Sequence, residues 1–157
     1  MSPSAFIFSF TLALAACGPS GDPLPGYPRI TWTSEIACVD EARMRSAFNL
    51  ALDVLGDYSP WSRDRVMRDI APCLVQVNAG FAIETVTGPV GGLAFETEGR
   101  VQVVQSLRSL AHELLHIVVY RNTGVIDLTD QHVGLGWERT DLIEQDFRAR
   151  LPDLCWP

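Results

Sequence analysis

A histidine pair separated by one helical turn carries the clearest chemical signal in the chain, within the sequence His-Glu-Leu-Leu-His at residues 112–116. Side chains at positions i and i+4 project from the same face of an α-helix. On a helix, His112 and His116 can therefore bind one Zn²⁺, with Glu113 beside the remaining coordination position. The pentad predicts a metal centre in which a carboxylate accepts a proton from a metal-activated water.

A catalytic zinc site needs a third protein ligand and leaves its fourth position to water. His132 is the leading candidate, because it is the only other histidine and follows a loop long enough to return to the helix. Glu138, Asp127 and Asp130 are alternatives, since carboxylates also bind zinc. The two aspartates can instead orient a ligand imidazole or stabilise the loop through Asx turns.

Apolar residues around the pentad recur with helical spacing, which predicts an amphipathic helix over residues 106–120. The expected core stripe consists of Leu107, Leu110, Ala111, Leu114 and Val118. Both histidines lie off this stripe, so we expect them to face away from the core. Gly124 is expected to end the helix in a left-handed conformation. Tyr120, one turn beyond His116, either covers the core or donates a hydrogen bond to a reaction intermediate.

The remaining pattern predicts an α+β domain. A first long helix is expected over residues 36–55, ended by Gly56, and a loop with a short helix is expected within residues 57–72. A closing helix is expected over residues 137–151. Alternating apolar and polar residues predict a meander of short strands, after a first short strand at residues 29–33. The strands are expected at residues 74–77, 81–87, 92–97 and 100–104.

These elements together predict a small, mostly antiparallel sheet packed against an N-terminal helix and the helix of the pentad. The edge of this sheet, formed by residues 100–104 or by their hairpin partner at residues 92–97, could dock an extended peptide, and the alternative is an ordinary capped edge strand.

The first 16 residues have the features of a signal peptide. The apolar run from Phe6 to Ala16 is too short to cross a bilayer as a helix, and it leads into Leu-Ala-Ala-Cys at residues 14–17. This ending resembles the lipobox of bacterial lipoproteins, which implies cleavage before Cys17 and attachment of lipid to it. Residues 17–28 are rich in proline and glycine and predict a tether, which leaves residues 29–157 for the folded domain.

Charge and cysteine content agree with export. The chain has a net charge of −7, so we expect neither nucleic acid nor an anionic membrane surface as a partner, and membrane attachment through lipid alone. The lipoprotein resemblance implies a bacterial cell envelope, and Gly18 after Cys17 favours the outer membrane or periplasmic side. With Cys17 acylated, Cys38, Cys73 and Cys155 allow one disulfide and one free thiol, and the sequence does not determine the pairing.

Residues 106–148 resemble the active-site segment of the SprT-like zincins, a group of zinc metallopeptidases. The resemblance depends on the pentad, on His132-Val133-Gly134 and on an aromatic residue at Trp137. It implies a minimal zincin core with His112, His116 and His132 as zinc ligands. The predicted activity is hydrolysis of a peptide or protein substrate by a membrane-anchored metalloprotease, with Glu113 as general base. The alternative is a lipid-anchored binding module whose zinc is structural or whose zincin core is inactive.

Overall fold

The computed structural model describes residues 27–32, 39–127 and 131–151. The predicted signal peptide, Cys17 and most of the tether lie outside the described residues. The same is true of Cys38, Asp130 and Cys155.

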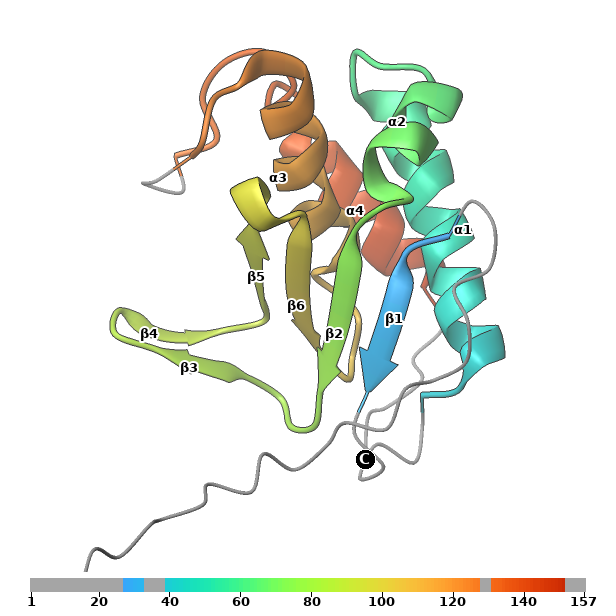
Figure 1. Cartoon of the computed structure of the whole chain (residues 1–157), viewed down its shortest axis with the longest axis vertical. Coiled ribbons are helices and arrows are strands. Elements are labelled where there is room, and N and C mark those ends of the chain that lie inside the picture. The colour runs from blue at the N-terminus through green and yellow to red at the C-terminus, as the bar shows by residue number, and fades with distance from the viewer. Residues whose placement is uncertain (1–26, 33–38, 128–130, 152–157) are drawn as a thin grey trace, which may run out of the picture.

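A four-stranded mixed sheet forms one layer of the domain (Figure 1). Its strands are β1 (Arg29–Trp32), β2 (Leu74–Asn78), β6 (Arg100–Val104) and β5 (Gly92–Phe95), in that spatial order. The first three strands run parallel, and β5 pairs antiparallel with β6 at one edge. A separate hairpin of β3 (Ile83–Thr85) and β4 (Gly88–Val90) projects away from the body of the molecule.

The predicted mostly antiparallel meander is therefore wrong, although its last hairpin, β5 with β6, is present. The alternating pattern shows that one face of the sheet is buried, which is more common in antiparallel sheets but does not determine strand direction. Val75, Val77, Val101 and Val103 are buried on one face. Gln76 and Gln102 are only partly buried and are joined by a 3.0 Å hydrogen bond. Strand β6 also lies between β2 and β5, so it is not an edge that could dock a peptide.

Four α-helices pack with the sheet: α1 (Glu41–Tyr58), α2 (Arg63–Ile70), α3 (Leu110–Thr123) and α4 (Thr140–Arg150). Asp40 caps α1 by accepting a 2.8 Å hydrogen bond from the backbone N–H of Arg43. The predicted end at Gly56 is wrong, because α1 continues to Tyr58. Gly56 serves a close approach instead, since an added Cβ there would lie only 3.0 Å from Cβ of Arg63 at the start of α2.

Helix α3 runs through the hydrophobic core. All five residues of its predicted stripe are buried, but Leu107 lies in the turn before the helix, with a φ angle of 56°. Leu115, Ile117 and Val119 are buried as well, so the helix is covered on nearly every side. The expectation that both histidines face away from the core is met only in part. They line a cleft, but His116 is itself buried and His112 is partly buried.

The domain is a mixed α+β structure in which the helices lie behind and beside the sheet (Figure 1). The predicted helical end at Gly124 is confirmed, with a left-handed φ of 72°. Helix α4 confirms the predicted closing helix. In the part of the chain that the structure describes, no helix combines the length and apolar character needed to cross a bilayer.

Candidate metal centre

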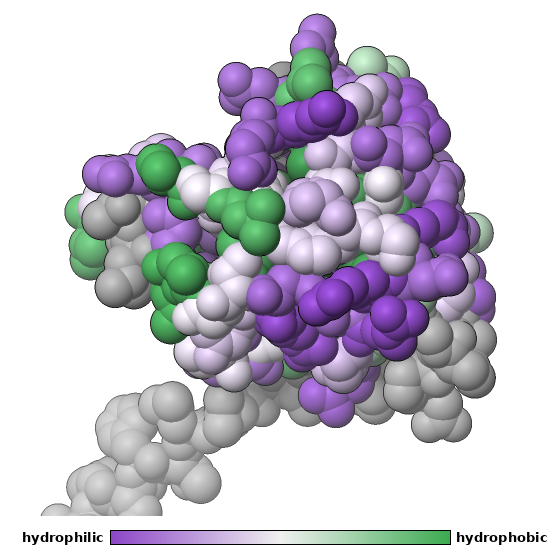
Figure 2. All heavy atoms as spheres, turned by 90° about the horizontal axis from the view of Figure 1, so that it is seen from above, coloured by the Kyte–Doolittle hydropathy of each residue, from purple (hydrophilic) through white to green (hydrophobic). Residues whose placement is uncertain are grey.

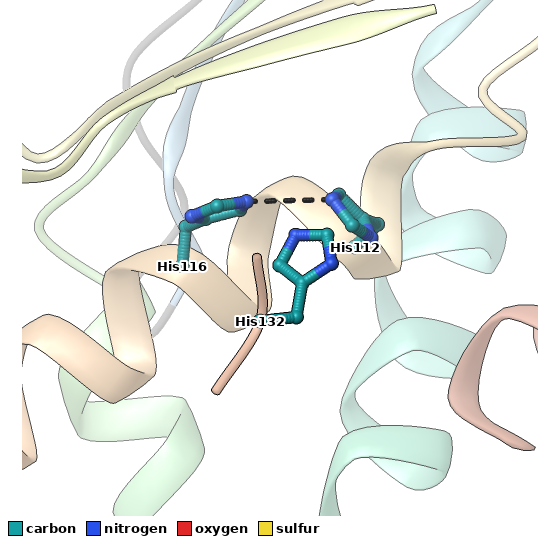
Figure 3. A group of neighbouring side chains, drawn as sticks. All are labelled: His112, His116 and His132. Atoms are coloured by element: carbon teal, nitrogen blue, oxygen red, sulfur yellow. Dashed lines mark hydrogen bonds between the residues drawn. The ribbon is translucent and has the colours of Figure 1, made fainter. Parts of the chain in front are cut away.

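The three histidines of the chain lie together (Figure 3). His112 and His116 come from α3, and His132 comes from the connection between α3 and α4. One ring nitrogen from each histidine lies within 4.8 Å of the others. The structure thus brings together the three residues that the sequence predicted as metal ligands.

The spacing within the helical pair fits a tetrahedral zinc ion. The Nε2 atoms of His112 and His116 are 3.3 Å apart. Zn–N bonds of about 2.0–2.1 Å at tetrahedral angles place two ligand nitrogens about 3.3–3.4 Å apart. Nitrogen donors of this kind also suit zinc chemically.

Each helical histidine has a carboxylate beside its other ring nitrogen. Oε1 of Glu144, on α4, lies 2.8 Å from Nδ1 of His112. Oε1 of Glu96 lies 3.2 Å from Nδ1 of His116, and Glu96 begins the short 3-10 turn η1 (Glu96–Glu98) after β5. Neither glutamate was predicted from the sequence. The only available signal was the general rule that ligand histidines donate to carboxylates, which names no position in the chain.

The loop that carries His132 is held by Asp127. The Asp127 carboxylate accepts hydrogen bonds from the backbone N–H groups of Gln131, at 3.2 Å, and His132, at 2.6 Å. These bonds accompany a left-handed φ of 52° at His132, a conformation that costs free energy in a non-glycine residue. Of the roles considered for Asp127, stabilising the loop is the one that these contacts show.

Glu138 does not join the histidine group. Its carboxylate accepts a 2.8 Å hydrogen bond from the backbone N–H of Gly136, and the residue is exposed. The group found in the described residues contains the three histidines alone.

Trp137 forms a buried wall against the histidines. Its ring centroid lies 4.7 Å from that of His116 and 4.5 Å from that of His132. The preceding residue, Gly136, has a φ of 100° and packs closely on Trp61, since an added Cβ would lie 2.5 Å from the Trp61 ring. The indole therefore restricts where the imidazole rings of His116 and His132 can move.

A cleft of about 560 Å³ opens beside the histidine pair. Residues of the β4–β5 segment line one side, and His112, Glu113 and His116 line another. Glu113 is only 6% exposed and lies against β5, since a Cβ added to Gly92 would be 2.6 Å from its Oε1 atom. Tyr120 is not among the residues that line this cleft.

The charged groups of the cleft are mainly acidic. Glu96, Glu113, Asp127 and Glu144 line it, and the one lining arginine, Arg148, is paired with Glu144 at 2.7 Å. Carboxylates around a histidine group favour a bound cation electrostatically.

Exposed hydrophobic residues occur after α3 and at the tip of the β3–β4 hairpin. Ile126, which follows α3, lines the cleft and is 37% exposed, while Val86 at the tip of the β3–β4 hairpin is fully exposed. The view from above shows separate hydrophobic groups concentrated on one side of that face, with mostly hydrophilic surface on the other (Figure 2).

Comparisons with protein-family models, with curated proteins and with solved structures found no match. The geometry of the site is therefore the basis for assigning a function.

Proposed function

We propose that this protein is a zinc-dependent hydrolase of peptide bonds in which Glu113 is the general base. The observation that carries the proposal is the convergence of three histidines beside a carboxylate, where two of the histidines and the carboxylate line a cleft bordered by an edge strand. Structural zinc sites are usually closed by four protein ligands, whereas three ligands and an accessible cleft are typical of catalytic sites.

The chain's own groups divide the work of hydrolysis. Zinc held by His112, His116 and His132 would polarise the substrate carbonyl and lower the pKa of a bound water to about 7. Glu113 lines the cleft immediately after His112, and its carboxylate takes the proton of the attacking water. The same carboxylate then passes this proton to the departing amine nitrogen, which completes cleavage of the peptide bond.

The substrate in this proposal is an extended peptide that pairs with β5. In the described sheet, β5 is bonded to β6 on one side only, and Gly92, Leu93 and Ala94 of β5 line the cleft. The unpaired backbone groups of an edge strand bind extended segments through main-chain hydrogen bonds. Leu93 and Ile126 supply apolar contacts for side chains of the peptide.

We further propose that the enzyme is exported and anchored to the cell envelope through lipid on Cys17. The support is the sequence of the N-terminal residues, including the short apolar run and the Leu-Ala-Ala-Cys ending. Palmitate or diacylglyceryl labelling of wild-type protein but not of a Cys17→Ala variant tests this part separately.

Glu113→Gln in the full-length protein is the decisive experiment. The amide keeps the size of the side chain but cannot accept the proton, so we expect zinc content to stay the same and peptide cleavage to fall by at least about 100-fold. Cleavage is measured on a dye-labelled unfolded protein, with and without a chelator and re-added zinc. Glu98→Gln is the matched control, because Glu98 is an exposed glutamate that pairs with Arg100 and does not line the cleft.

The outcomes separate the enzyme from the binding module. Zinc-loaded wild-type protein that cleaves none of a broad set of peptides, and whose Glu113→Gln variant has unchanged properties, would support a structural or inactive site. Wild-type protein that cannot bind added zinc would refute the metal centre itself.

A further inference from the structure

Two carboxylates from different parts of the fold meet the two helical histidines on the side away from the metal position. Glu144 reaches Nδ1 of His112 from α4, and Glu96 reaches Nδ1 of His116 from the turn after β5. Their side chains are 25% and 12% exposed, so water screens these contacts only in part. Such an arrangement on both histidines needs an explanation beyond the pairing of surface charges.

The two contacts have a common chemical effect. A carboxylate beside Nδ1 favours the proton on that nitrogen, which leaves the lone pair of a neutral imidazole on Nε2. Both Nε2 atoms then present lone pairs toward each other across 3.3 Å. Two facing lone pairs repel unless a cation lies between them.

We propose that Glu144 and Glu96 are positioning residues that hold His112 and His116 with Nδ1 protonated and Nε2 directed at the metal. The inference rests on the proposed metal centre and deepens it by assigning two residues that act on the ligand histidines and are not themselves metal ligands. A carboxylate that accepts a hydrogen bond from a ligand imidazole fixes the ring orientation and raises the basicity of the ligand nitrogen. Glu144 makes this contact with His112, whereas Glu96 lies 3.2 Å from Nδ1 of His116 at an ion-pair distance, without hydrogen-bond geometry.

Glu144 contacts both His112 and Arg148, one with each carboxylate oxygen. Its Oε2 atom pairs with Arg148 at 2.7 Å, one turn further along α4, while its Oε1 atom faces His112. The arginine holds one oxygen and thereby fixes the rotation of the carboxylate. Ring orientation at His112 is thus coupled to the docking of α4 against α3.

Zinc affinity of the full-length protein tests the proposal, measured by competition with a zinc-binding dye. We expect Glu144→Ala and Glu96→Ala to weaken zinc binding by about 10- to 100-fold each. Glu144→Gln and Glu96→Gln are expected to bind zinc more tightly than the alanine variants, because an amide oxygen still accepts a hydrogen bond from Nδ1–H.

The chain offers a matched control for each glutamate. Asp146 forms the same kind of i, i+4 pair on α4, with Arg150 at 3.0 Å, and its side chain is 28% exposed. Glu98 lies on the same turn as Glu96 and pairs with Arg100 at 2.9 Å. Asp146→Ala and Glu98→Ala should leave zinc affinity within about twofold of wild type, since neither residue contacts a histidine in the structure.

A second measurement needs no variant. A long-range ¹H–¹⁵N correlation spectrum of zinc-loaded wild-type protein should show Nδ1–H on both histidines. Protons on Nε2 would overturn the proposal, as would equal zinc affinity in wild type and both alanine variants. Wild-type protein that takes up no zinc would overturn the proposed function together with this inference, whereas a zinc-binding protein without peptidase activity would overturn the proposed function alone.

Discussion

Gly92→Ala should displace the side chain of Glu113 while lowering the stability of the fold only slightly. Gly92 begins β5 and lies against the side chains of Ser109 and Glu113 at the start of α3. A Cβ at this position would lie 2.6 Å from both Cγ and Oε1 of Glu113 and 2.6 Å from Oγ of Ser109. All three atoms belong to side chains, so the side chains can move while the two backbones stay in place.

The size of the effect follows from these distances. Ordinary van der Waals contact begins at 3.4 Å, so the Glu113 side chain must move by about 0.8 Å. Adding one methyl group to a tight contact costs about 1–3 kcal/mol, and we expect the lower end because flexible side chains relieve it. That corresponds to a melting temperature lower by about 4 °C in a domain of this size. Misplacing a catalytic group by about 1 Å can cost about 100-fold in rate, so we expect cleavage to fall by 10- to 100-fold.

Gly91→Ala is the matched control. A Cβ added there meets only Oγ and Cβ of Ser109, at 3.7 and 3.8 Å, which is ordinary contact. Both variants are compared for melting temperature, zinc content and initial rate of peptide cleavage. We expect both to bind zinc, because neither added methyl contacts a histidine. If Gly92→Ala cleaves as fast as Gly91→Ala, the reasoning about Glu113 is refuted. If Gly92→Ala loses zinc, the substitution has also displaced the histidines of α3, and the expectation that only the side chains of Glu113 and Ser109 move is wrong.

Two further predictions concern Asp127 and Cys73. Asp127→Ala removes the acceptor of two backbone hydrogen bonds in the His132 loop, so it should weaken zinc binding by about 10-fold or more in a dye-competition assay. The control Glu138→Gln should have little effect. Unchanged zinc affinity in Asp127→Ala would contradict the proposed role of Asp127 in holding the loop. Burial raises the pKa of the Cys73 thiol from 9.0 to about 11, so alkylation at pH 8 should be much slower in the folded protein than in urea. The thiol of the unfolded chain ionises at lower pH than the buried thiol, so the wild-type protein should lose stability between pH 9 and 11. Its free energy of unfolding should fall by up to about 1.4 kcal/mol per pH unit more than that of Cys73→Ala. Parallel pH profiles of the two proteins would contradict this.

The pentad and its helix were predictable because the signal is local. His112, Glu113 and His116 have their relation fixed by helical geometry, and Gly124 ends the helix as its type suggests. His132 was predictable for a different reason, since it was the only remaining histidine.

The positioning carboxylates could not be predicted, because their relation to the histidines arises from tertiary packing. Glu144 is 32 residues from His112, and its place is set by how α4 packs on α3. Glu96 depends on the pairing of β5 with β6, which places the following turn over His116. Nothing in the neighbouring sequence distinguishes Glu144 from other glutamates on a predicted helix.

Strand direction was mispredicted for a related reason. The pattern of buried valines in β2 and β6 is the same whether the strands run parallel or antiparallel. Direction depends on the connection, and here the β3–β4 hairpin and β5 together carry the chain back so that β6 runs parallel to β2.

The strand order also determines which way the cleft faces when the protein is held by its N-terminus. Strand β1, the first element after the predicted tether, is at one edge of the sheet, and β5 is at the other. Three inter-strand spacings, roughly 14 Å, separate the two edges. Attachment through residues before β1 would leave the cleft at the sheet edge opposite to the attachment, where a polypeptide can approach β5 without first passing the anchored side of the domain.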